Sequence, residues 1–134
     1  MKKALGATIT ATMALALTAI MTSPAQAAST AGCATTGASG GVKISNWSGP
    51  GATVGLTFNL IDTLGDDHHV RIRLVSEQSG GNKVYWPWRK NYDGVNTTKT
   101  WTSTASDDRG LFEIGVEVAR FEGDQLLNSC TNWA

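Results

Sequence analysis

The run DDHHV at positions 66–70 holds the residue types that carry out much of protein chemistry. Aspartate and histidine together can ligate zinc, and a carboxylate can orient a histidine that acts as a base. The spacing is poor for both, because adjacent side chains on a strand point to opposite faces. The aspartates also follow Gly65 in a stretch of turn composition, where aspartate accepts local backbone hydrogen bonds. We therefore expect a hairpin turn here. A weak divalent-cation site and a catalytic centre are the less favoured alternatives.

Motifs for covalent and phosphate chemistry are missing from the chain. The sequence contains no GxSxG nucleophile motif and no phosphate-binding glycine loop ahead of a helix. A carboxylate pair for glycoside hydrolysis is not excluded by composition, but most acidic residues fall in turns or on faces expected to be solvated. We therefore expect neither an enzyme, nor a catalytic residue, nor a cofactor or metal.

The stretch VYWPWRKNYDG, residues 84–94, gathers four aromatic rings. On a strand with period two, Val84, Trp86 and Trp88 share one face, while Tyr85 and Pro87 share the other. Pro87 lacks an N–H group, so this strand belongs at the edge of a sheet. At least one tryptophan is expected in the core, and an exposed patch of rings beside basic groups is typical of a binding surface. The candidate binding residues are Tyr85, Trp88, Arg89, Lys90 and Tyr92.

Apolar and polar residues alternate with period two in the rest of the chain, as in strands with one face on a core and one in water. The runs 53–61, 69–75 and 111–119 show this alternation most clearly. Clusters of turn residues separate seven candidate strands, at 42–46, 52–62, 69–76, 82–88, 95–103, 110–121 and 125–131. We therefore predict an all-β fold, an antiparallel two-sheet sandwich of about seven strands with immunoglobulin-like topology. A small β-barrel is the alternative.

An immunoglobulin-like topology makes the third and sixth of these strands neighbours. Arg71 and Arg73 would then face outward beside Glu113 and Glu117 as cross-strand pairs of opposite charge. Such pairs are worth a few tenths to about 1 kcal/mol each at a surface. We expect a solvated structural ladder rather than a binding patch.

The N-terminus has the features of an export signal. Two lysines precede an uncharged apolar run at 4–21, and an Ala-x-Ala cleavage site ends at Ala27. We expect a cleaved helical signal peptide at 1–27, a flexible lead-in at 28–41 and one β-sandwich domain at 42–134. The product is then secreted, extracellular and not held in a membrane.

Signal removal also changes the charge of the chain. The remaining chain has nine basic and eleven acidic residues and no basic stripe. Nucleic acid is therefore not expected as a partner. We expect a monomer. In an oxidising compartment, the two cysteines, Cys33 and Cys130, are expected to form one disulfide that closes nearly the whole domain.

The whole chain resembles small secreted single-domain β-sandwich proteins of actinomycetes that have no assigned function. The resemblance rests on the Ala/Thr-rich signal, the hairpin IGVEVARFEGDQLLNSC at 114–130, and the cysteine that closes this hairpin. It implies a sandwich without catalytic residues. Secreted inhibitors of proteases or amylases from such bacteria have a similar size, but usually carry two disulfides around a rigid exposed loop.

Three functional hypotheses follow. The leading one is a non-catalytic extracellular interaction module, with a protein or a polysaccharide as its ligand. The second is an inhibitor of an extracellular hydrolase that uses WPWRKNYDG (86–94) as its inserted loop. The third is a small hydrolase, which would need carboxylates or His69 to gather in a cleft.

Overall fold

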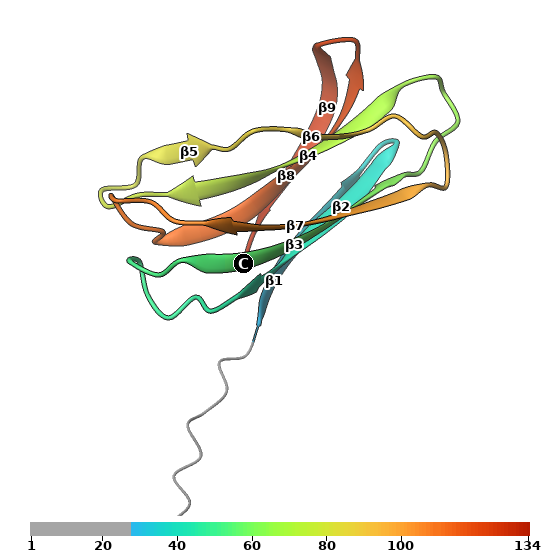
Figure 1. The fold of residues 1–134 in the computed structure, drawn as a ribbon. Coiled ribbons are helices and arrows are strands. Elements are labelled where there is room, and N and C mark those ends of the chain that lie inside the picture. The colour runs from blue at the N-terminus through green and yellow to red at the C-terminus, as the bar shows by residue number, and fades with distance from the viewer. Residues whose placement is uncertain (1–27) are drawn as a thin grey trace, which may run out of the picture.

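The computed structural model describes residues 28–134 as an all-β domain (Figure 1). The expected signal peptide at 1–27 lies outside the described residues. The nine strands are β1 (Ser29–Thr35), β2 (Ala38–Ser45), β3 (Val54–Asp62), β4 (His69–Glu77), β5 (Lys83–Tyr85), β6 (Arg89–Asn91), β7 (Thr98–Ala105), β8 (Glu113–Glu122) and β9 (Gln125–Trp133). Within this part of the chain no helix is long and apolar enough to cross a membrane.

The strands form two antiparallel sheets. The first sheet has the order β1-β2-β3-β7, and the second has the order β5-β4-β8-β9, with β6 also paired to β4. Inward-facing aliphatic side chains of both sheets, such as Leu60 and Val116, fill the core between them. The predicted all-β, antiparallel, two-sheet architecture is confirmed, with nine strands instead of about seven. The strands fall into two separate sheets, so residues 28–134 do not form the closed barrel considered as the alternative.

The segment 28–41, expected to be a flexible lead-in, instead forms β1 and the first half of β2. Its residues are small because the backbones lie close together. A Cβ on Gly40 would lie 2.7 Å from the carbonyl oxygen of Asn59 on β3, and Gly37 takes a positive φ of 83° in the β1–β2 turn. Small residues give no hydrophobic alternation, so the sequence pattern did not reveal this hairpin.

The predicted strand at 82–88 is interrupted in the structure. Val75 on β4 pairs with Tyr85, and Ile72 pairs with Arg89, so two residues of β4 stand opposite three residues, 86–88. The extra residue changes the phase of alternation at Pro87. The strand lies at the sheet edge, as its proline predicted.

The phase change separates the two tryptophans. Trp86 packs against the core and donates its indole N–H to Ser76 Oγ at 2.9 Å. The Trp88 ring lies against Arg73, whose side chain is on the outer face of β4. The expectation that Trp86 and Trp88 share one face was therefore wrong, because it assumed an unbroken strand.

The outer face of the second sheet is mostly buried, although we expected it to face water. Arg71, Val75 and Ala119 point outward, yet each is at most 5% exposed. Of the expected charge pairs, Arg73 and Glu117 face each other as predicted. Arg71 instead pairs with Asp124, and Glu113 stands opposite Glu77.

A disulfide joins the two sheets at one edge of the sandwich. Cys33 on β1 is bonded to Cys130 on β9, with their Cα atoms 6.2 Å apart. The bond closes a loop of 97 residues in sequence separation. The predicted pairing of the two cysteines is confirmed.

Candidate functional site

Stacked side chains cover the outer face of the second sheet, and we call this set the aromatic layer. It consists of Tyr85, Arg73, Trp88, Phe121, Arg71, His69 and Tyr92. Its members come from β4, β5 and β8 and from residues beside β6, and each contacts at least one other member. The two ends of the layer, Tyr85 and Tyr92, are exposed at 55% and 62%.

Arg73 holds the first half of this layer together. Its guanidinium carbon lies 4.4 Å from the centre of the Tyr85 ring and 4.1 Å from that of Trp88. The same group binds Glu117 Oε1 through Nε and Nη2, both at 2.6 Å. A planar cation suits this place, because it stacks on rings while its edge donates to a carboxylate.

Arg71 holds the second half in a similar way. It lies 3.9 Å from the centre of the Phe121 ring and donates from Nε to His69 Nε2 at 2.8 Å. Its Nη2 donates to Gly123 O at 2.8 Å and to Asp124 Oδ1 at 3.1 Å. These bonds fix the turn between β8 and β9 to strand β4.

The candidate binding residues do not all lie together. Tyr85 and Trp88 belong to the aromatic layer, and Lys90 is on the same outer face, opposite Arg71. Tyr92 stacks on His69 with a centroid distance of 4.2 Å, at the far end of the layer. Arg89 points the other way, with its guanidinium 5.0 Å from the centre of the core ring of Phe58.

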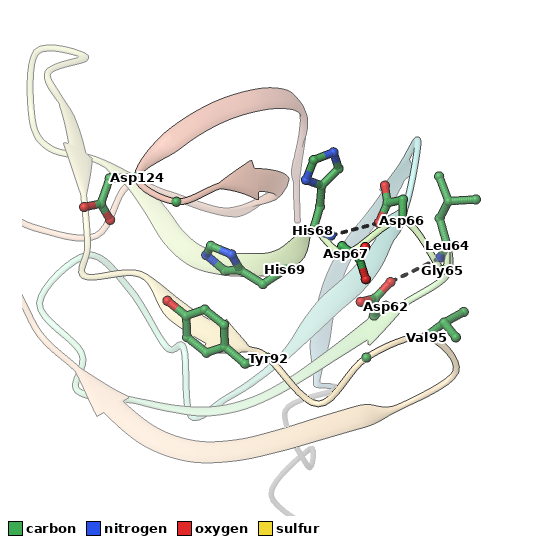
Figure 2. A pocket seen from close by; sticks show the side chains of 12 residues that line it. Asp62, Leu64, Gly65, Asp66, Asp67, His68, His69, Tyr92, Val95 and Asp124 are labelled. Carbon is green, nitrogen blue, oxygen red and sulfur yellow. Dashed lines mark hydrogen bonds between the residues drawn. The ribbon is translucent and has the colours of Figure 1, made fainter.

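A cleft of about 820 Å³ opens beside Tyr92 at one end of the sandwich (Figure 2). Three segments surround it: the β3–β4 loop, the β6–β7 loop and the β8–β9 turn. In Figure 2, Asp62, Asp66 and Asp67 stand on one side of it, and His69 and Tyr92 stand on the other. We call residues 63–68, 92–97 and 123–127 the loop end. They comprise these three segments and the first three residues of β9.

Two of the four aspartates that line the cleft are paired with arginine. Asp66 accepts from Arg120 at 2.8 Å, and Asp124 accepts from Arg71 at 3.1 Å. Desolvation alone raises the pKa of Asp66, but the hydrogen bonds from Arg120 and the His68 N–H outweigh it and lower that pKa. The Arg71 hydrogen bond and charge lower the pKa of Asp124.

The other two cleft aspartates have no cationic partner within residues 28–134. Asp62 is only 2% exposed, and its Oδ1 accepts from the Leu64 N–H at 3.1 Å. Asp67 is exposed and adopts a positive φ of 60°. The cleft therefore carries uncompensated negative charge.

His69 lines this cleft, is neutral near pH 7 and accepts a hydrogen bond from Arg71. Burial, followed by the charges of Arg71 and Lys90, lowers the pKa of His69. Because Arg71 donates to Nε2, the proton of the neutral ring is on Nδ1. This Nδ1–H group has no hydrogen-bond partner in the described chain. Because every fully buried side-chain nitrogen and oxygen there has a partner, the group must contact solvent.

Exposed apolar side chains gather at the same end of the molecule. Seven large apolar residues are exposed in residues 28–134, and five of them belong to the loop end. These five are Leu64, Tyr92, Val95, Leu126 and Leu127. The first three line the cleft itself, and the last two are the second and third residues of β9. We call these five residues the apolar rim.

Sequence reasoning found part of this site. It named Tyr92 and the DDHH run, and Asp66 does accept a local bond from the His68 N–H at 3.2 Å. However, β3 and β4 are in different sheets, so this run is an inter-sheet loop and not the hairpin turn that we expected. Asp62 was missed because it ends an alternating strand. Across the described residues, no group of three or more His, Cys, Asp or Glu could hold a metal ion.

No protein-family model, curated protein or solved structure matches the chain. The function must therefore be argued from the geometry of the site.

Proposed function

We propose that this protein is a secreted, non-catalytic interaction module that binds an extracellular protein through its loop end. One observation carries the proposal: three exposed members of the apolar rim, Leu64, Tyr92 and Val95, line one cleft of about 820 Å³. Exposed apolar side chains that gather in one place mark interaction surfaces, whereas scattered ones need no explanation. The disulfide supports an extracellular location, because such bonds persist in oxidising compartments.

The proposal includes an immunoglobulin-like topology. Strands β2, β3 and β7 take the places of A, B and E, and β5/β6, β4, β8 and β9 take those of C′, C, F and G. Strand β1 is an addition beside β2. In this assignment the β3–β4 loop and β8–β9 turn are the B–C and F–G connections, which variable domains use for recognition.

The geometry gives little support to an inhibitor that inserts residues 86–94. That stretch is not one free loop, because residues 89–91 in its middle form β6 and pair with β4 along the sheet edge. Trp86 is packed against the core, so it is not available to enter another protein's active site.

A small hydrolase has one observation in its favour, because carboxylates and His69 do line one cleft. The groups are not arranged for the chemistry. His69 Nε2 already accepts from Arg71, so this nitrogen is not free to take a substrate proton. The lowered pKa values of Asp66 and Asp124 keep both ionised, whereas glycoside hydrolysis needs a carboxyl group that retains its proton.

Capture from culture fluid tests the proposal. The protein purified after export is immobilised as wild type, as Val95→Ser and as Phe112→Ser, and bound proteins are identified by mass spectrometry. Phe112 is an exposed ring outside the loop end and is the matched control. We expect a partner that wild type and Phe112→Ser retain and Val95→Ser loses. Identical captured sets for all three proteins would contradict the proposal.

A further inference from the structure

We propose that the cleft receives a basic side chain, an arginine or a lysine, of the partner protein. This inference rests on the proposed function and names the chemistry of its recognition. It places the cation between the Tyr92 ring on one side of the cleft and the carboxylates of Asp62 and Asp67 on the other.

The charge of the cleft selects a cation. Arg120 compensates Asp66 and Arg71 compensates Asp124, whereas no described cation pairs with Asp62 or Asp67. Asp62 is nearly completely buried, and a buried carboxylate is ordinarily paired with a cation or a metal. The described groups do not suit a metal ion, so an organic cation is the fitting ligand.

The ring of Tyr92 provides the second element of recognition. One of its faces is stacked on neutral His69 at 4.2 Å, which holds the ring in position, and 62% of the residue remains exposed. A guanidinium or ammonium group over such a ring gains a cation–π interaction. The protein already uses this contact internally, where Arg73 lies between Tyr85 and Trp88.

The apolar rim favours a protein as the source of that cation. Protein interfaces typically enclose a desolvated arginine or aromatic anchor within a ring of contacts that exclude water. Leu64 and Val95 line the cleft and are 41% and 44% exposed, so they are free to form such a ring. A free amine would leave these side chains without a contact.

Titration of the ¹⁵N-labelled protein with N-acetylarginine amide tests the inference. N-acetylcitrulline amide, which has nearly the same shape without the charge, is the matched control. We expect arginine amide to shift the amide signals of 64–69 and 92–95 in a saturable way, and citrulline amide to shift them much less. Asp67→Asn is expected to weaken binding about twofold to fivefold, as for a partly exposed ion pair. Asp108→Asn, an exposed aspartate outside the loop end, is expected to leave it unchanged.

Several results would overturn the inference. Equal shifts from the two amides would show that charge is not recognised. Shifts confined to other residues, or unchanged affinity in both Asp62→Asn and Asp67→Asn, would remove the cleft from the interaction. If N-acetylglucosamine shifts the backbone amide signals of 64–69 and 92–95 and arginine amide does not, the cleft is a sugar site.

The Val95→Ser variant separates this inference from the proposed function. We expect Val95→Ser to lose capture of the partner protein, because it removes an apolar contact, and Asp67→Asn to weaken the binding of arginine amide. If capture depends on Val95 and arginine amide does not bind, the loop end binds its partner through groups other than a basic side chain. In that case only the present inference fails.

Discussion

Arg73 shows how one side chain stabilises an exposed edge. Its guanidinium contacts two rings, Tyr85 and Trp88, which lie on either side of Pro87. It also neutralises Glu117 on the neighbouring strand. Strands β5 and β6 are only three residues each, so few backbone hydrogen bonds hold them. Arg73 therefore links the interrupted edge strand to the centre of the sheet.

Replacing Arg73 is expected to destabilise the fold. Arg73→Ala removes two cation–π contacts and leaves Glu117 without its partner, so we expect a loss of about 2–3 kcal/mol in the free energy of unfolding. Arg73→Lys keeps the charge but not the planar fork, and we expect about half of that loss. Urea denaturation measures both. Arg109→Ala, at an exposed site, is expected to change stability by less than about 0.5 kcal/mol. Equal effects at the two positions would refute this role.

His69 gives the fold a pH dependence of known sign. Its pKa in the folded protein is lowered below the ordinary value of 6.5, so below that pH the unfolded chain binds a proton that the folded chain does not. Stability is therefore lost as the pH falls from about 7.5 through this ordinary value. His69→Gln retains an acceptor for Arg71 without this titration, so we expect its melting temperature to fall less over the same range. Parallel pH profiles for the two proteins would contradict this account.

At the scale of single residues, the sequence predicted some members of the site and not their grouping. Tyr92 was identified because a tyrosine in a turn beside basic residues is expected at the surface. Arg89 was grouped with it by proximity in sequence, but its side chain is on the inner face of β6. The pairing of Asp66 with Arg120 joins residues 54 positions apart, and no local pattern encodes such a contact.

Strands β8 and β9 depend on a glycine at their close approach. A Cβ on Gly115 would lie 2.9 Å from the Trp133 ring and would also collide with the carbonyl oxygen of Asn132. We expect Gly115→Ala to destabilise the protein by about 1–3 kcal/mol, as overpacking usually does, and to change the tryptophan fluorescence. Gly51→Ala meets no atom within 4 Å and is the control, with little expected change in melting temperature. A Gly115→Ala melting curve like the wild type's would show that Trp133 moves away without cost.

Hydrophobic alternation predicted the elements wherever large residues supply it. The strands expected at 52–62 and 69–76 agree closely with β3 and β4. Strand β1 was missed because alanine, glycine and threonine carry almost no hydrophobic contrast. The phase change at Pro87 was missed because an inserted residue shows in the pairing register and leaves little trace in composition.

The disulfide is expected to contribute strongly to the stability of the whole molecule. It closes a loop of 97 residues, for which the chain-entropy relation gives about 4.7 kcal/mol. Reduction is therefore expected to lower the melting temperature by about 15–30 °C in a domain of this size. The double variant Cys33→Ala/Cys130→Ala is the control and should melt at the reduced temperature with or without reductant. A wild-type melting curve that is unchanged by reductant would contradict the prediction.

The whole fold brings together segments that are distant in sequence. The loop end combines residues near 64, 93 and 124, and only the two-sheet arrangement places them around one cleft. The sequence predicted the sandwich, but the identity of the converging loops depends on strand order. Seven candidate strands admit many orders, so the site could not be predicted from composition and spacing.

Photo-crosslinking tests most directly the central claim that the loop end contacts a partner. The photoreactive residue p-benzoylphenylalanine replaces Val95 at the cleft or, as the control, Phe112 outside the loop end. Each protein is irradiated in culture fluid. We expect position 95 to form one adduct of discrete mass that unlabelled wild-type protein competes away, and position 112 to form none. Absence of any adduct from position 95, or equal adducts from both positions, would contradict the account.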